Sequence, residues 1–92
     1  MAMLKLYQLT TPTSATQVTA THTYVRQAVI SNSGANNTAI GDKTMTSAAT
    51  GVNIPSGVNY SLGPTAGEAA FDLSELYVLA ATGNVNVLAI LH

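Results

Sequence analysis

The chain has 92 residues, a net charge of −1 and no cysteine, and only 8% of its residues are charged while 47% are hydrophobic. This length fits one domain over residues 1–92, and the absence of cysteine excludes disulfides and thiolate chemistry. An average globular domain carries about 25% charged residues, so this chain lacks the charged surface that keeps a small protein monomeric. We therefore expect a homo-oligomer, for which a trimer is one arrangement.

The N-terminal third predicts strands separated by polar turns. Residues 4–9 form the first candidate strand. Because residues 1–13 are rich in apolar side chains for a chain terminus, we expect them to form an N-terminal arm or an edge strand that touches another chain. Residues 18–32 predict one long strand or two strands, and a turn cluster follows at residues 33–37.

The middle of the chain repeats this pattern with shorter segments. Residues 38–46 form a candidate strand in which Gly41 suggests a bulge or a close backbone approach. Residues 52–54 and 58–62 are short candidate strands on either side of a turn at residues 55–57, where proline and glycine occupy positions typical of a type I turn.

Helical periodicity is almost absent from the chain. The exception lies within residues 68–76, where Asp72 and Glu75 have the spacing of a helix cap and predict one helical turn. Threonine and valine are frequent elsewhere, and both favour strands. The sequence therefore predicts an all-β domain, a small β-sandwich or jelly-roll with at most one short helical turn.

The C-terminal segment carries the clearest turn signal. Residues 76–82 and 85–91 flank Gly83-Asn84, a pair typical of a two-residue hairpin loop. We predict a C-terminal hairpin that forms the core of the fold. Its expected cross-strand pairs are Leu76–Leu91, Tyr77–Ile90, Val78–Ala89, Leu79–Leu88, Ala80–Val87, Ala81–Asn86 and Thr82–Val85. Since both faces of this hairpin would be apolar, one needs a second sheet and the other a neighbouring subunit as cover.

No motif in the sequence indicates catalysis. His22 and Asp42 or Asp72 belong to no recognised motif, and the histidines and carboxylates are too scattered for a metal site. We therefore expect no enzyme activity, no cofactor and no metal. The basic residues do not cluster, which argues against nucleic-acid binding, and no apolar window is long enough to span a membrane. Packing is the expected role of the tyrosines, although a sugar-stacking platform is an alternative; these are Tyr7, Tyr24, Tyr60 and Tyr77.

From Arg26 onward, the order of short motifs resembles small bacteriophage virion proteins of the capsid decoration (cement) or head and tail accessory type. The elements that carry the resemblance are Ala28-Val29-Ile30-Ser31-Asn32 with Gly34, Ala39-Ile40-Gly41-Asp42, Gly51-Val52-Asn53-Ile54-Pro55-Ser56-Gly57, Asp72-Leu73-Ser74-Glu75-Leu76-Tyr77-Val78 and Gly83. They cover about two thirds of the chain and are specific only as a set. The resemblance implies a β-sandwich that acts through its surface and transfers no functional residue.

The function expected from this resemblance is structural. The protein would bind and stabilise a phage head, with itself and the major capsid protein or another virion protein as partners. It would be made in the host cytoplasm and carried on the particle surface. The alternatives are a neck, tail or fibre-associated virion protein and a carbohydrate-binding β-sandwich module. The candidate interface residues are Leu4, Leu6, Tyr7, Leu9, Tyr77, Leu79, Leu88 and Ile90.

Overall fold

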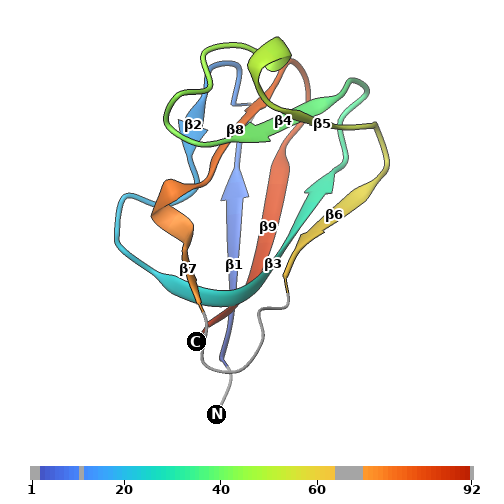
Figure 1. The fold of residues 1–92 in the computed structure, drawn as a ribbon. Helices are drawn as coiled ribbons and strands as arrows, with labels where there is room; N and C mark the ends of the chain where they lie inside the picture. Colours follow the sequence, from blue (N-terminus) through green and yellow to red (C-terminus); the bar gives the residue numbers. More distant parts are fainter. Residues whose placement is uncertain (1–2, 11, 64–69, 92) are drawn as a thin grey trace.

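The computed structural model describes residues 3–10, 12–63 and 70–91, which form two antiparallel β-sheets packed face to face (Figure 1). The strands are β1 (Met3–Leu9), β2 (Thr16–Gln17), β3 (Tyr24–Asn32), β4 (Thr38–Gly41), β5 (Val52–Ile54), β6 (Asn59–Leu62), β7 (Phe71–Asp72), β8 (Tyr77–Ala80) and β9 (Val85–Leu91). Two short 3-10 turns are η1 (Ala48–Thr50) and η2 (Leu73–Glu75). The prediction of a small all-β sandwich is confirmed.

Each sheet draws strands from both halves of the chain. Sheet A has the order β1-β9-β3-β6, and β7 pairs with the first residues of β3. Sheet B has the order β2-β8-β4-β5. The two longest ladders flank β9, which pairs with β1 over seven residues and with β3 along nearly its whole length. The centre of sheet A is therefore β9, and its edges are β1 and β6.

The core lies between the sheets and follows the period-two alternation of the strands. Sheet A contributes the buried side chains of Val25, Ala28, Ile30, Val85, Val87 and Ala89, and sheet B contributes Ile40, Ile54, Val78 and Ala80. In β3 the register with β9 shifts between Val25 and Gln27. This bulge at Arg26 lets both Val25 and Ala28 point inward, because one extra residue restores the alternation.

The predicted C-terminal hairpin is wrong. Strand β8 lies in sheet B and β9 lies in sheet A, so residues 81–84 cross from one sheet to the other. The side chains of Val78 and Ala80 do face those of β9, but across the core and not as neighbours in one sheet. In this arrangement, β8 and β9 each bury one row of apolar side chains against the other strand, across the core. In a hairpin, the two strands would lie in one sheet, and both of its apolar faces would need cover from elsewhere. It also gives β9 two long partner strands, β1 and β3.

The two crossings between the sheets support each other. Residues 33–37 join β3 of sheet A to β4 of sheet B, beside the link between β8 and β9. A Cβ atom on Gly34 would lie 2.2 Å from the carbonyl oxygen of Thr82, and one on Gly83 would lie 2.6 Å from the Cα of Gly34. Gly83 also has a φ of 76°. The Gly-Asn signal thus marks a close backbone approach and a left-handed residue, which a crossing needs as much as a hairpin does.

Asn32 fastens the crossing that follows β3. Its side chain is buried, donates to the carbonyl oxygens of Asn36 (2.9 Å) and Ile54 (2.8 Å), and accepts from the backbone N–H of Gly34 at 3.1 Å. A buried amide is stable only when its polar atoms are paired in this way. The Asn-x-Gly element of the sequence is therefore explained by chain geometry.

Both short helical turns cap or connect strands. The turn η2 falls within the predicted helical segment, and the side chain of its N-cap residue Asp72 accepts from the backbone N–H of Ser74, so the predicted capping role is confirmed. The turn η1 lies in residues 42–51 between β4 and β5, so the prediction of at most one short helical turn is wrong by one turn. The strand expected at residues 38–46 ends at Gly41 because the chain turns there, with the Asp42 side chain accepting from Thr44.

Candidate functional site

The outer face of sheet A carries exposed apolar side chains on neighbouring strands. Its rows run across the four strands, so that Leu6, Leu88 and Val29 lie opposite one another, and Leu4 lies opposite Ile90. We call this surface face A. Its outward-pointing members are Leu4, Leu6 and Gln8 of β1, Asn86, Leu88 and Ile90 of β9, Gln27, Val29 and Ser31 of β3, and Asn59 and Ser61 of β6.

Face A is both apolar and uncharged. The exposed fractions are 68% for Leu4, 54% for Leu6 and 41% for Leu88, while Val29 and Ile90 are half-buried by their neighbours. None of the eleven outward residues just defined is ionisable. Single exposed leucines are ordinary, but a contiguous group across three adjacent strands is a candidate contact surface.

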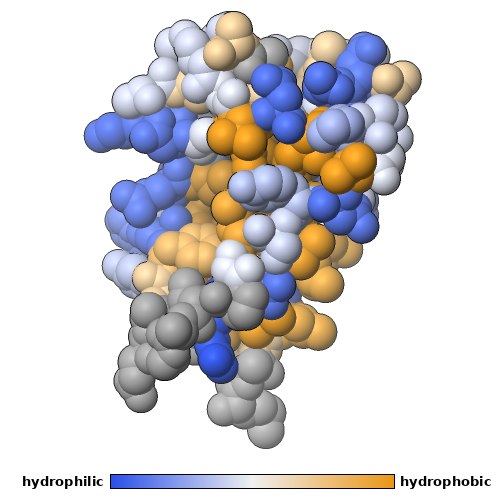
Figure 2. All heavy atoms as spheres, turned by 45° about the vertical axis from the view of Figure 1, so that its right-hand side comes forward, coloured by the Kyte–Doolittle hydropathy of each residue, from blue (hydrophilic) through white to orange (hydrophobic). Residues whose placement is uncertain are grey.

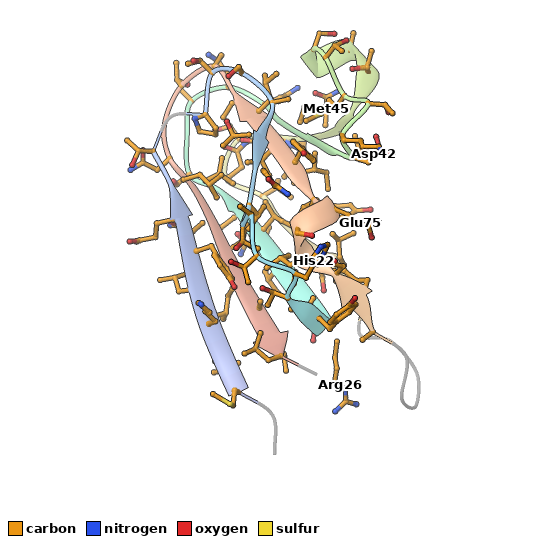
Figure 3. The ribbon with its side chains drawn as sticks, turned by 90° about the vertical axis from the view of Figure 1, so that its left-hand side faces the viewer. His22, Arg26, Asp42, Met45 and Glu75 are labelled. Carbon is orange, nitrogen blue, oxygen red and sulfur yellow. The ribbon has the colours of Figure 1, made fainter. Side chains whose placement is uncertain are left out.

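The outer face of sheet B is covered by the chain itself. Residues 42–51 fold back over it and bury Met45, which is only 3% exposed (Figure 3). The Met45 side chain fills the space above two glycines: a Cβ atom would lie 3.2 Å from its Sδ atom if placed on Gly41 and 2.5 Å if placed on Gly51. The small residues on this face form a slot for one methionine. The neighbouring outward residues Tyr77 and Leu79 are half-buried.

The structure divides the predicted interface residues among three environments. Leu4, Leu6, Leu88 and Ile90 lie together on face A. Tyr7 and Leu9 belong to the inward row of β1, and the side chain of Leu9 is buried in the core, away from face A. Tyr77 and Leu79 lie on the outer face of sheet B. Leu79 and Leu88, predicted to be neighbours, are therefore on opposite outer faces of the molecule.

Two members of these surfaces were missed by the sequence analysis. Val29 completes the apolar row of face A, and Met45 covers sheet B. Val29 follows from strand alternation once β3 is known to neighbour β9. Met45 has no comparable signal, because a methionine in a polar loop shows no periodicity.

A second apolar region lies where β5 and β6 form the open edges of the two sheets. Figure 2 shows apolar residues reaching the surface along this side. Val52 is 54% exposed, Val58 is 42% exposed, and Leu62 is half-buried. These side chains belong to two sheets and a turn, so they do not form one flat surface like face A.

A polar groove of about 290 Å³ lies beside the loop that covers sheet B. Its lining residues are Gln17, Asp42, Lys43, Ser74, Glu75 and Tyr77. Tyr77 is the one tyrosine in this lining; Tyr7 and Tyr60 belong to the inner rows of sheet A, and Tyr24 lies on β3. The four tyrosines therefore form no common platform.

His22, Asp72 and Ser74 come together although they are far apart in the sequence. Nδ1 of His22 contacts Oδ2 of Asp72 at 2.5 Å and Oγ of Ser74 at 3.3 Å. In a Ser–His–Asp triad, the serine and the aspartate contact different ring nitrogens, whereas here both contact the same one. The arrangement therefore lacks the geometry of a triad and instead fastens the segment before β3 to η2.

Electrostatics at this cluster follow from the same contacts. The hydrogen bond from His22 lowers the pKa of Asp72 far below its usual range, and the backbone N–H groups of Ser74 and Thr23 add to this effect. The hydrogen bond and charge of Asp72 in turn raise the pKa of His22 above its ordinary value. Since the His22 side chain is 79% exposed, water screens the pair.

Within residues 3–10, 12–63 and 70–91, no group of three or more histidine, cysteine, aspartate or glutamate side chains could hold a metal ion. No helix in the same part of the chain is long and apolar enough to cross a membrane. A scan against protein-family models finds no match, and a search of the curated proteins finds none either. Face A is the candidate site because its exposed leucines form one contiguous surface.

Proposed function

We propose that this protein is a structural virion protein that decorates the outside of a bacteriophage head and stabilises it by binding the major capsid protein. Face A carries the proposal, because its exposed leucines form an apolar, uncharged surface on a rigid sheet. The motifs that resemble phage decoration proteins lend the virion role its support. A protein that holds capsid subunits together needs a binding surface and no catalytic residues, and face A supplies such a surface.

A repeated shell suits a surface of this kind. Every capsid subunit offers the same site, so several modest contacts can act together and exceed the strength of any one of them. Because face A has no charge, its attachment would depend on burial of apolar area and change little with salt. A charged docking surface would instead weaken as the ionic strength rises.

The test compares heads assembled with and without this protein. We expect electron microscopy to place the protein on the outer surface of the head, and we expect heads that carry it to release their DNA at a higher temperature. Attachment should persist between low and high salt. Location on the neck, tail or fibres would replace the proposed site, and absence from the particle would contradict the proposal.

A further inference from the structure

The strand β1 is unusual among the four sheet edges. The other edge strands are short, with two residues in β2, three in β5 and four in β6, whereas β1 has seven. Short edges are protected from pairing because they offer few free backbone groups. In the described part of the chain, β1 pairs with β9 alone, so its other edge offers a seven-residue row to a partner (Figure 3).

The usual protections of a long edge strand are almost absent from β1. It contains no proline, and its seven-residue register with β9 shows no bulge that would twist it away. Its single charge is Lys5, whose Nζ lies 5.3 Å from the centre of the Tyr7 ring. Lys5 is therefore the one protective charge on this edge, and it stands on the inward row of β1, opposite Ala89. A seven-residue edge with one such device remains open to pairing with another strand.

The sequence of β1 is complementary to itself in one antiparallel register. A two-fold axis at Leu6 sets Leu6 opposite its own copy and overlaps all seven residues. The remaining pairs between one copy and its symmetry mate are Met3 with Leu9, Leu4 with Gln8 and Lys5 with Tyr7. This register repeats the Lys5–Tyr7 cation–π contact between chains. Moving the axis to Lys5 would place two ammonium groups opposite each other, which is unfavourable.

We propose that β1 pairs with β1 of a second copy of this chain about a two-fold axis at Leu6. The pairing joins two copies of sheet A into one continuous sheet whose main path, β6-β3-β9-β1 and its symmetry mate, is eight strands wide. Because directly opposite residues in an antiparallel ladder point to the same side, the two copies of face A merge into one surface. The product is a dimer, in contrast to the trimer considered from composition.

The merged surface of two copies has a footprint close to that of a standard protein interface. One face A of four strands covers roughly 400 Å², at ~4.8 Å between strands and ~3.3 Å per residue. A standard protein interface takes about 800 Å² from each partner, which is about twice that area. Two copies joined through β1 reach it. The dimer itself rests on the edge strand alone, while the use of the merged face for attachment rests on the proposed function.

Sedimentation of the purified full chain tests the dimer without any phage particle. We expect a concentration-dependent dimer for the wild type. Leu6→Asp places two carboxylates opposite each other at the axis and should weaken dimerisation about tenfold or more. Leu88→Asp, on the same face but on the central strand β9, should leave the dimer intact, as should Val58→Asp in the turn before β6. Circular dichroism confirms the fold of each variant.

Disulfide trapping tests the register, since the natural chain has no cysteine. Leu6→Cys should form a covalent dimer on oxidation. Leu4→Cys and Gln8→Cys should each form no covalent dimer alone, and they should cross-link to each other when mixed. Val58→Cys should form no covalent dimer alone or when mixed with either of them. A monomer at every concentration, a trimer, or a dimer without these cross-links would overturn the proposal. A dimer that binds no phage head would leave this inference standing and contradict only the proposed function.

Discussion

The two outer faces of this sandwich differ in how their outward-pointing positions are covered. On sheet B, the outward positions beside Met45 are the small residues Ala39 and Gly41, and the loop of residues 42–51 returns to fill the space above them. On sheet A, the corresponding positions hold leucines, and no described segment covers them. One face is completed within the chain, and the other is left uncovered by the described residues.

The difference indicates that the residues that stabilise this domain are separate from those available for binding. Met45 is buried almost completely and contributes to folding, whereas Leu4 and Leu6 remain more than half exposed and contribute little to it. A substitution at the covered part of sheet B should therefore destabilise the fold strongly, and one on face A should change stability little and mainly alter what the protein binds. The predictions below test that division, beginning with the largest expected effect.

Removal of the side chain that covers sheet B should have the largest effect. We expect Met45→Ala to lower the free energy of unfolding by about 2–5 kcal/mol, because a buried side chain leaves a cavity that the slot between two glycines cannot close. Urea denaturation measures this change. A loss below about 1 kcal/mol would mean that the loop covers sheet B without stabilising it.

A side chain added beneath Met45 should also destabilise this region, because it would occupy the space that the methionine fills. A Cβ atom on Gly51 would lie 2.5 Å from the Sδ atom of Met45 and 2.8 Å from the carbonyl oxygen of Ile40, so Met45 must move and the backbone must shift. We expect Gly51→Ala to lower the free energy of unfolding by about 1–3 kcal/mol. Gly57→Ala is no matched control, because Gly57 has a φ of 76°. Ala49→Ser, at an exposed position of η1, should change stability little.

On face A, the corresponding truncation should matter far less. Leu88 is 41% exposed, so Leu88→Ala should cost about 1 kcal/mol or less in the same urea experiment. This differs from the large loss expected of a hairpin buried on both sides. Equal losses for Leu88→Ala and Met45→Ala would show that face A is covered in solution, and they would erase the contrast between the two faces.

The smallest effect should come from a pair that belongs to neither face. The pKa of His22 is raised in the folded protein, so its contribution to stability is fully present below pH ~6.5 and is lost as the pH rises through the folded value. The pKa of Asp72 is lowered, so its contribution is present above pH ~3.9 and is lost only in stronger acid. Both groups are therefore charged near pH 5.5.

Thermal melts of the wild type and of His22→Gln at low ionic strength measure this contribution. The wild type should exceed the variant by more at pH 5.5 than at pH 8.5, because His22 loses its charge at the higher pH. A difference that does not change with pH would show that the imidazole acts by packing and not by charge.

Much of the fold follows from the sequence because strand alternation and turn residues act locally. The strands around Leu4–Leu9, Tyr24–Asn32 and Asn59–Leu62, and the cap at Asp72, all follow from these local rules. The separation of β8 and β9 into different sheets could not be predicted, because Gly83 permits a crossing as well as a hairpin. Which sheet each strand joins depends on distant partners, here β1 and β3 for β9.

The candidate site was predictable only in part for the same reason. Alternation places Leu4 with Leu6, and Leu88 with Ile90, but only the pairing of β1 with β9 unites the two pairs on one surface. Leu9 was misassigned because its position at the end of β1, beside Val85, buries it. Loop coverage of sheet B has no periodic signal, so the contrast between the faces became visible only in three dimensions.

Binding of the protein to phage heads that lack it is the most direct test of the claim that face A is the attachment surface. Wild type, Leu88→Asp and Val58→Asp can be mixed with such heads and sedimented; both substitutions add one carboxylate at an exposed apolar residue, but only Leu88 lies on face A. We expect Val58→Asp to bind like the wild type and Leu88→Asp to bind about tenfold more weakly or worse, because it buries an unpaired charge. Equal binding by Leu88→Asp and the wild type would contradict the account.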